Sequence, residues 1–242
     1  MEIQESFICL QPEEADINEV VGWLKKEMSN DIRGCGFYNN RNVIYEAYER
    51  GSAITFKYKG KNIGLLIYGF DNELIVDIDI FVIHPTYRGQ GYGTTFYNLA
   101  SQFFRENGYY VIRLFCSPKE SETFWQRIGL KKLPECGIWQ HDLTYYDVLV
   151  DTALKTSSVG MDKIELWDVE PFEAENVEPR WTWYVDSNDD RQSYPIIHPS
   201  NCNWKLRWSR NGIVLREDKI KYITENVNEI YISPFLYIKK GF

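Results

Sequence analysis

The most constraining stretch of this sequence is residues 84–95, HPTYRGQGYGTT, which places three glycines at alternate positions, 89, 91 and 93. Glycine loses more conformational freedom on folding than any other residue, so a cluster of glycines indicates a backbone that turns sharply or approaches another group closely. A β-rich run, NELIVDIDIFVIHP, precedes these glycines, and TTFYNLASQFFREN follows them with an apolar stripe at helical spacing. The sequence therefore predicts a strand, a glycine turn and a helix in direct succession.

A junction of this kind favours an anion as its ligand. Several free backbone N–H groups point at one place, and the positive end of the helix dipole adds to their attraction. Arg88 adds a permanent positive charge with forked donors. A Walker P-loop is excluded because no lysine follows the glycines, and the dinucleotide fingerprint is excluded because Thr94 or Phe96 stands where its third glycine belongs. The pattern that fits is R-x-x-G-x-G, with Arg88, Gly91 and Gly93.

Strand-like and helical segments alternate through the first 150 residues. Residues 52–70 are predicted to form a hairpin around the turn KGKN. Further strands are predicted at residues 5–11, 109–117, 130–134 and 137–150. Further helices are predicted at residues 12–28, 39–51 and 119–129, and Gly51, Gly108 and Gly129 are expected to end helices.

Composition limits the class of function. The 242 residues are enough for one large domain or two smaller ones, and the net charge is −8 without any run of five like charges. An acidic chain without a basic patch argues against DNA as a partner. The N-terminus lacks the pattern of a signal peptide, and no apolar window is long enough to span a membrane. We therefore expect a cytoplasmic protein without a membrane partner.

Cysteine and histidine usage makes a metal site improbable. The five cysteines, at positions 9, 35, 116, 136 and 202, are scattered and never form a CxxC pair. The three histidines, at positions 84, 141 and 198, are isolated from one another. This usage fits a reducing compartment, and we predict no zinc site.

Composition changes after residue 150, where DTALKTSSVGMDK is polar and resembles a linker. Five of the eight tryptophans follow, in the short β-like bursts KIELWDV, RWTWYV, NWKLRWS, GIVLRE and EIYISPFLYI. We predict two domains, at residues 1–150 and 151–242, the second small and mostly β. Its paired tryptophans, at positions 181 and 183 and at 204 and 208, are expected in its core; a platform for stacking sugars or peptides is the alternative.

The R-x-x-G-x-G pattern in its strand–loop–helix setting resembles the acyl-CoA-binding motif of the GNAT superfamily of N-acetyltransferases. DIDIFVIHPTYRGQGYG is similar to that family's central strand with its V-x-P-x-x-R-G-x-G-x-G ending, and ETFWQRIGLKK is similar to its F-Y-x-K-x-G-F segment. The resemblance covers roughly residues 1–150. It implies an α/β (α+β) fold, a mixed and mostly antiparallel sheet flanked by helices, to which the small β-rich second domain is added.

The same resemblance implies an acyltransferase that moves an acetyl group from acetyl-CoA to a small-molecule or peptide amine. The amides of residues 88–93, with Thr94, would hold the coenzyme A pyrophosphate, and the end of the central strand would pair with the pantetheine amides. A splayed strand at this place leaves an N–H free to stabilise the thioester oxyanion. The implied coenzyme A-binding set is Phe81, Val82, Ile83, Arg88, Gly89, Gln90, Gly91, Tyr92, Gly93 and Thr94.

Two carboxylates on the central strand are the candidates for deprotonating the acceptor. Asp77 and Asp79 alternate with aliphatic residues, so they share one strand face about 7 Å apart. Two acids are costly against a dry core, so this face is expected to be wet. We prefer Asp77 as the base, with Asp79 binding the substrate cation. The alternative is an ordinary solvated face, or partners for nearby Arg or Lys.

The group that protonates the departing thiolate is not evident. Many relatives use the tyrosine of the F-Y pair, but this chain has Trp125 at that position, and indole is no acid at neutral pH. Tyr97, Tyr145 and Tyr146 are the possible replacements, and Tyr145 is included in the predicted catalytic set. Alternatively the thiolate leaves unassisted, because thiols are only weak bases.

The departure at position 125 keeps a second interpretation open. A catalytically weak or inactive acyl-CoA-binding protein would carry a C-terminal module for a protein or carbohydrate partner, and a homodimer is compatible with both interpretations. Cys116 is expected to be a buried structural thiol and His84 a loop residue.

Overall fold

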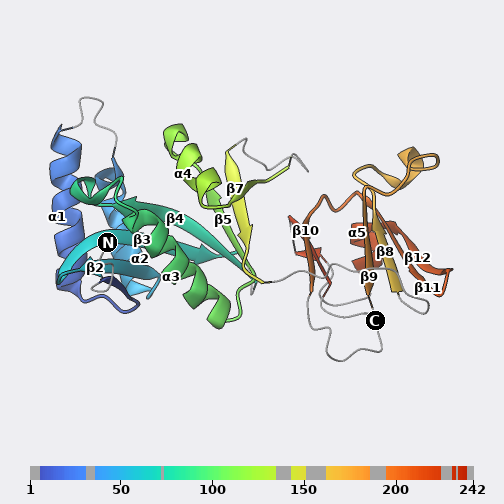
Figure 1. Cartoon of the computed structure of the whole chain (residues 1–242), viewed down its shortest axis with the longest axis horizontal. Helices are drawn as coiled ribbons and strands as arrows, with labels where there is room; N and C mark the ends of the chain where they lie inside the picture. The colour runs from blue at the N-terminus through green and yellow to red at the C-terminus, as the bar shows by residue number, and fades with distance from the viewer. Residues whose placement is uncertain are drawn as a thin grey trace. The chain divides into compact units, whose positions relative to one another are not determined.

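A computed structural model describes residues 6–30, 36–71, 74–134, 143–150, 162–185, 195–224, 231–232 and 234–238 (Figure 1). The chain divides into two compact units, Met1–Lys132 with Leu143–Leu149, and Leu133–Asp142 with Val150–Phe242. Most of the expected linker, together with Cys35, Cys136, His141 and the start of the strand expected at 137–150, lies outside the described residues. The boundary near residue 150 therefore stays a prediction.

A seven-stranded sheet in the order β1-β2-β3-β4-β5-β7-β6 forms the N-terminal unit. Its strands are β1 (Ser6–Cys9), β2 (Ala53–Tyr58), β3 (Lys61–Phe70), β4 (Ile75–Ile83), β5 (Val111–Phe115), β6 (Lys131–Lys132) and β7 (Thr144–Val148). Neighbouring strands are antiparallel except for β4 and β5, which are parallel. The predicted mixed, mostly antiparallel sheet is confirmed.

Helices flank both faces of this sheet (Figure 1). They are α1 (Glu14–Asn30), α2 (Arg41–Glu49), α3 (Tyr92–Glu106) and α4 (Glu122–Arg127), with the 3₁₀ turns η1 (Phe37–Asn40), η2 (Pro85–Tyr87) and η3 (Lys119–Ser121). One core lies between the sheet and α1 and α2, and it takes Ile80 and Val82 from β4. The other core lies under α3 and α4 and takes Ile78 and Ile83 from the same strand. The central strand therefore contributes aliphatic side chains to a core on each face of the sheet.

Local signals placed the turns of this unit correctly. The KGKN turn has Lys59 and Gly60 at φ 50° and 74°, the left-handed pair that a two-residue hairpin requires. The helix-ending glycines Gly51, Gly108 and Gly129 also have positive φ, at 71°, 86° and 105°.

A close approach between helix and sheet fixes the position of α3. A Cβ atom added to Gly64, in the middle of β3, would lie 3.0 Å from Ile83 Cδ1 and 3.1 Å from both Phe56 Cβ and Phe96 Cδ1. Phe96 of α3 stacks on Phe56 of β2 with ring centroids 5.0 Å apart. Because Gly64 has no side chain, Phe96 reaches the sheet, and the N-terminal end of α3 is held beside the end of β4.

The C-terminal unit is mostly β, as predicted. Two antiparallel sheets have the orders β12-β11-β8-β9 and β10-β14-β13. The strands are β8 (Asp162–Leu166), β9 (Trp181–Val185), β10 (Ile196–Pro199), β11 (Lys205–Arg210), β12 (Ile213–Lys219), β13 (Tyr231–Ile232) and β14 (Phe235–Ile238). The turn η4 (Pro171–Glu173) and the helix α5 (Ile220–Thr224) complete it. The sequence predicted neither α5 nor β10, because both are too short for periodicity to show.

The tryptophans of this unit pack in its core. Trp183 and Trp208 are buried among aliphatic residues of both sheets and of α5. Trp181 and Trp204 are half-buried against the same core and stack on each other with centroids 5.7 Å apart. The core interpretation is confirmed for Trp183 and Trp208, which are too buried to offer a stacking platform.

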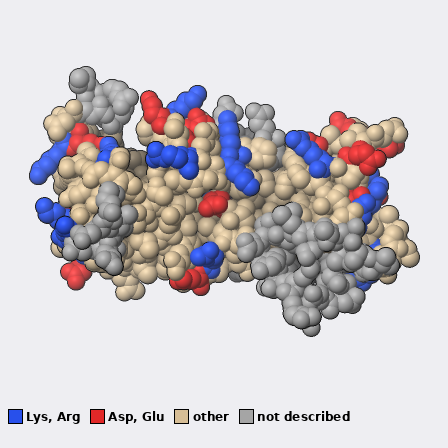
Figure 2. All heavy atoms as spheres, viewed as in Figure 1, with Lys and Arg blue, Asp and Glu red and all other residues tan. Residues whose placement is uncertain are grey.

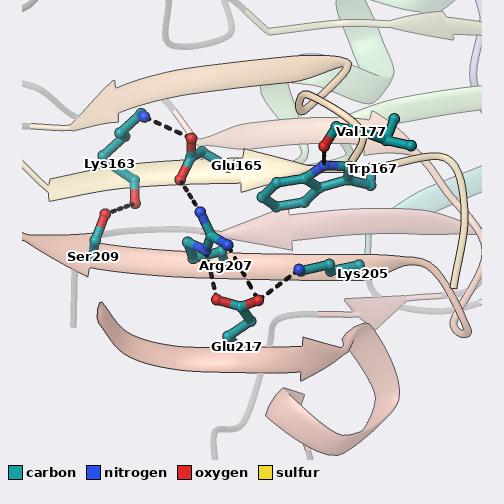
Figure 3. A network of polar contacts seen from close by, with 8 residues as sticks. All are labelled: Lys163, Glu165, Trp167, Val177, Lys205, Arg207, Ser209 and Glu217. Carbon is teal, nitrogen blue, oxygen red and sulfur yellow. Dashed lines mark hydrogen bonds and ion pairs between the residues drawn. The ribbon is translucent and has the colours of Figure 1, made fainter. Parts of the chain in front are cut away.

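The opposite face of the four-stranded sheet carries a network of charges (Figure 3). Arg207 of β11 stands directly opposite Glu165 of β8 and Glu217 of β12. It donates to Glu217 with N–O distances of 2.6 and 3.2 Å and lies 3.7 Å from Glu165. Lys205 Nζ lies 2.5 Å from Glu217 and 4.8 Å from the centre of the Trp167 ring. Pairing of both signs makes this partly buried charge tolerable.

None of the helices in the described ranges is long and apolar enough to cross a membrane. On the face seen in Figure 2, Lys and Arg side chains lie singly or in small groups among uncharged surface. Acidic side chains gather over the segment that carries η4.

We predict that Gly64→Ala lowers the free energy of unfolding of the N-terminal unit by about 1–3 kcal/mol, because the added methyl overpacks the contact with Phe56 and Phe96. The matched control is Gly22→Ala on the exposed side of α1, where an added Cβ meets nothing within 4 Å. That change should stabilise the unit by about 1 kcal/mol through helix propensity. Urea unfolding followed by circular dichroism measures both; equal effects would contradict the close packing at Gly64.

We predict that Glu217→Gln destabilises the C-terminal unit by about 1–2 kcal/mol at neutral pH, the lower part of the range for losing a hydrogen bond to a charged group. The lower part applies because the Glu217 side chain is partly exposed to solvent. The hydrogen bond from Arg207, helped by Lys205, lowers the pKa of Glu217 to about 2. The stabilisation is therefore present above the ordinary glutamate pKa and is lost as pH falls toward 2. Unfolding of wild type and variant between pH 7 and pH 2 should converge at the acid end. The exposed Glu175→Gln is the control.

Candidate active site

Strands β4 and β5 diverge in the middle of the sheet (Figure 1). Their parallel ladder runs from Ile75 and Val111 to Ile78 and Leu114. Beyond Ile78, β4 continues along β3, while β5 remains paired with β7. Within the described residues, 79–83 therefore have no strand partner on the β5 side, and this edge can pair with an extended ligand.

A β-bulge lies where the two strands part. In the β3–β4 ladder, Ile67 stands opposite Ile80 and Tyr68 opposite Ile78, so Asp79 is an extra residue on β4. A bulge of this kind disrupts the ladder locally and redirects side chains. It moves Ile80 to the α1 and α2 core, whereas Ile78 stays under α3. The sequence predicted regular alternation here and so missed the bulge.

Asp77 is committed to an ion pair. It stands directly opposite Arg113 of β5, the pair before the last of the ladder. Arg113 donates to both carboxylate oxygens, with Nε–Oδ1 2.6 Å and Nη2–Oδ2 2.8 Å. Arg113 Nη2 also lies 3.0 Å from Asp71 Oδ2. The expected alternative, in which an aspartate of this strand is the partner of a nearby arginine, therefore describes Asp77.

Asp79 lies differently. Asp79 is exposed, and its Oδ2 atom lies beside Gly69 of β3, where an added Cβ atom would make an ordinary contact at 3.8 Å. Partial desolvation, and then the charge of Asp77, raise the pKa of Asp79 above its ordinary value, while Arg50 opposes the rise. A carboxylate with a raised pKa and access to solvent is suited to accept a proton near neutral pH.

The glycine turn presents free amides at the end of β4. Gly89 and Gly91 have φ of 74° and 89°, a conformation that L side chains rarely adopt. The first described bond of α3 runs from the Thr95 N–H to the Gly91 carbonyl at 3.1 Å, so the amides of Tyr92, Gly93 and Thr94 precede the intrahelical ladder. Such amides at a helix N-terminus form an anion site.

Gly93 has a second reason to be glycine. A Cβ atom there would lie 3.2 Å from the ring of Phe124, which belongs to α4. Phe124 also stacks on Phe81 of β4, with centroids 5.9 Å apart. The start of α3, helix α4 and the free half of β4 therefore meet around one small residue.

Arg88 is held by neighbouring groups. Its Nε donates to the Ile83 carbonyl at 2.8 Å, and its Nη1 lies 2.7 Å from Glu27 Oε1 in α1. Arg88 thus links the end of β4 to α1. Gln90 stabilises the turn from within, because its side chain donates a hydrogen bond to the Thr86 carbonyl at 2.7 Å. In this structure both side chains brace the turn.

The remaining members of the predicted coenzyme A set lie at the same end of the sheet. Phe81 is half-buried under α3, and Val82 and Ile83 are buried on opposite faces of β4. Tyr92 is buried at the start of α3, where a hydrogen bond with Tyr58 raises its pKa to about 12. The structure therefore brings all ten predicted residues together, although Val82 and Ile83 offer only their backbone.

This geometry agrees with the comparison of the sequence with known families. The family model described as Acetyltransferase (GNAT) family matches residues 15–130. The chain contains a GNAT domain. No curated protein sequence matches the chain.

Solved structures of acetyltransferases match part of this chain. Ard1 from Thermoplasma volcanium is 15% identical, with a TM-score of 0.47, over 61% of this chain and 99% of that one. An acetyltransferase from Streptococcus agalactiae 2603 is 17% identical, with a TM-score of 0.47, over 60% and 99%. The GNAT family N-acetyltransferase YhbS from Escherichia coli, solved in complex with CoA, is 13% identical, with a TM-score of 0.46, over 60% and 82%.

The residues considered as general acids in the GNAT domain are buried. Trp125 is buried, 5.2 Å from the Phe81 ring and 5.9 Å from the Tyr97 ring between centroids. Tyr145 is fully buried; its hydroxyl donates to Glu122 and accepts from Gln126 Nε2 at 2.9 Å.

Burial also makes the tyrosines weak acids. Burial and the hydrogen bond to Glu122 raise the pKa of Tyr145, and burial raises the pKa of Tyr97, which donates to Asp147 at 2.9 Å, well above its ordinary value. Tyr146 is buried as well. Proton transfer from such phenols to a thiolate is uphill, because an ordinary thiol pKa is about 8.5.

Two other residues keep the roles that the sequence suggested. Cys116 is buried, its Sγ lies 3.1 Å from Ser121 Oγ, and burial raises the pKa of its thiol, so it is no activated nucleophile. His84 is a loop residue whose Nδ1 accepts the Thr86 N–H at 3.2 Å, and burial with Arg88 lowers its pKa. Among the described residues, no three His, Cys, Asp or Glu side chains could hold a metal ion.

Sequence reasoning missed two cations of this site. Arg113 lies in the predicted strand YYVIRLFCS, where one arginine interrupts an otherwise apolar run, and this interruption was the available signal. Arg50, at the end of α2, had no signal, because only the fold brings it toward Asp79.

We predict that Gly91→Val lowers the free energy of unfolding of the GNAT domain by about 1–2 kcal/mol, because its φ of 89° is costly for an L residue. Gly91→Asn should cost less, since asparagine visits left-handed conformations more readily. An added Cβ at Gly91 meets nothing within 4 Å, so the expected loss comes from backbone strain and not from a clash at Cβ. Equal losses in urea unfolding would mean that the turn adopts another conformation.

Proposed function

We propose that this protein transfers an acetyl group from acetyl-CoA to an amine acceptor, either a small molecule or a peptide. One observation carries the proposal: the free edge of β4 leads from the Asp79 bulge to the unpaired amides that start α3. The edge and the amides suit the two polar parts of coenzyme A, an extended pantetheine with two amides and a pyrophosphate.

Donor binding follows from this geometry. The pyrophosphate would accept hydrogen bonds from the amides of Tyr92, Gly93 and Thr94, with the remaining turn amides nearby. The pantetheine would add itself to residues 79–83 as an extra strand, which places its thioester at the Asp79 end. Arg88 would contribute by holding the turn and by its charge, since its Nε is already bonded to Ile83.

Asp79 is the better base. Asp77 was preferred on sequence grounds, but both of its oxygens accept hydrogen bonds from Arg113. Asp79 is exposed and lies at the place where β4 and β5 part. We therefore propose that Asp79, in place of Asp77, takes the proton of the acceptor, directly or through water, while Asp77 stays paired with Arg113.

The transfer balances as follows. The acceptor ammonium gives one proton to Asp79, and the neutral nitrogen attacks the thioester carbon, forming a C–N bond and an oxyanion. A backbone N–H at the opened strand stabilises this oxyanion. The C–S bond then breaks with its electron pair on sulfur. The second nitrogen proton passes to the thiolate, which gives free coenzyme A and an amide, and Asp79 releases the first proton to solvent.

This scheme needs no tyrosine as acid. The positively charged nitrogen of the intermediate is a far stronger acid than a buried phenol, so it can protonate the sulfur directly or through water. Tyr145, bound between Glu122 and Gln126, then has a structural role under α4. The tryptophan at position 125 is compatible with transfer for the same reason.

A second candidate function is an acyl-CoA-binding protein without efficient transfer. The sealed surroundings of Trp125 and Tyr145 favour it. In both cases the C-terminal unit would contribute an acceptor-binding, partner-binding or dimer-forming surface. The free thiols of Cys9, Cys116 and Cys202 are compatible with a reducing compartment such as the cytoplasm.

We predict that wild-type protein, given acetyl-CoA and a panel of amines, releases free thiol, and that Asp79→Asn reduces the rate about 100-fold or more. Asp71→Asn, an exposed carboxylate near the same arginine, should stay within about threefold of wild type. Because a raised pKa keeps Asp79 protonated to higher pH, activity should fall as pH drops through that pKa.

Binding is measured separately, as the thermal shift caused by coenzyme A. Binding that survives in Asp79→Asn, with turnover lost, supports the transferase. Binding without thiol release in the wild type favours the acyl-CoA-binding protein. No thermal shift at all would overturn both candidates.

A further inference from the structure

The position of Arg113 in the sheet gives it a more specific role than that of an ordinary surface partner. Its cross-strand pair with Asp77 precedes the last pair of the β4–β5 ladder, Ile78 with Leu114. Two residues beyond Asp77 comes the bulged Asp79, where the strands have parted. Arg113 therefore binds across the two strands immediately before they open.

The charges at this place are unequal in number. Three carboxylates gather here, those of Asp71, Asp77 and Asp79. The forked guanidinium of Arg113, only 22% exposed, contacts two of them, with one nitrogen 2.6 Å from Asp77 Oδ1 and another 3.0 Å from Asp71 Oδ2. Arg50 acts on Asp79 from the end of α2 without a described hydrogen bond to it. Asp79 is thus the carboxylate that Arg113 leaves uncommitted.

Without Arg113, the chemistry of the two strand aspartates would be different. Two carboxylates near each other share protons and cations, and neither acts alone as a base. Asp77 would then compete with Asp79 for the acceptor's ammonium and its proton. A fork that satisfies both oxygens of Asp77 prevents this competition, which a lysine with its single point of charge would do less well.

We propose that Arg113 is a positioning residue of the transfer reaction: it commits Asp77 to a bidentate ion pair across the point where β4 and β5 part, so that proton acceptance falls to Asp79 alone. This inference rests on the proposed function. It adds to it a residue from a different strand, and it explains why two neighbouring aspartates of one strand have different roles.

The decisive experiment compares Arg113→Gln, Asp77→Asn and the double variant Asp77→Asn/Arg113→Gln, which replaces the ion pair with a neutral pair of similar shape. In the ligand-free protein, the side-chain carboxyl signal of Asp79 is titrated by carbon-13 NMR and assigned by its loss in Asp79→Asn. In the same variants, kcat/KM for acetyl transfer is measured against pH, with the amine that gives the fastest thiol release.

The Asp79 titration should follow a fixed order. Its pKa should be highest in Arg113→Gln, where the charge of Asp77 is uncompensated, then lower in wild type, the double variant and Asp77→Asn, in that order. This order follows from the contribution of Asp77 to the raised pKa of Asp79. The acid limb of kcat/KM should move in the same order, a shift that a merely structural role for Arg113 would not cause.

Rates give the second readout. Arg113→Gln should lower kcat/KM by about 10- to 100-fold, the range for loss of a positioning contact, and adding Asp77→Asn should restore most of it. Arg113→Lys should fall between wild type and Arg113→Gln. Thermal unfolding of each variant without ligand identifies any variant whose lower kcat/KM results from unfolding of the protein.

Two outcomes overturn the proposal. One is an Asp79 titration that does not respond to either substitution. The other is a double variant as inactive as Asp79→Asn, which would make Asp77 the base. If no amine releases thiol in the wild type, the proposed function fails. The order of the Asp79 pKa values measured by NMR still decides whether Arg113 pairs with Asp77 and leaves Asp79 to accept the proton.

Discussion

The separation of β4 from β5 after Ile78 and Leu114 is the constraint on which the rest of the GNAT domain depends. A parallel pair cannot open in the middle of a buried sheet unless other contacts hold both strands. Here β3 holds β4, β7 holds β5, and the Arg113–Asp77 pair joins the two strands just before they part. The opening supplies both the free edge for a donor and the bulge that sets Asp79 apart.

Small residues determine what can come close to this opening. Gly64 allows Phe96 to reach the sheet, and Gly93 allows Phe124 to cover the start of α3. Gly89 and Gly91 serve another purpose, since their positive φ turns the chain from the strand into the helix. The cluster of glycines thus combines a steric and a conformational requirement, and both lead to the same row of amides.

The C-terminal unit shows how one sheet uses its two faces. Side chains such as Trp208 and Leu206 enter a core, while Arg207, between them in sequence, joins charges on three strands. This division arises because successive side chains of a strand point to opposite faces of the sheet. The tryptophans that suggested a binding surface in the sequence mostly pack in the core. Any binding role of this unit would therefore depend on surfaces other than Trp183 and Trp208.

Much of the architecture could be read from residue order, because strand alternation, helical spacing and turn glycines act over a few positions. The hairpin at KGKN, the strand before the glycines and the helix after them were determined in this way, and so was the family resemblance. The elements β10 and α5 were too short to show. Only the tertiary structure decided which aspartate is free: Arg113 is 36 residues from Asp77, and the bulge arises from the register with β3. Contacts between distant segments have no local signature, so the sequence alone named both carboxylates and could not tell them apart.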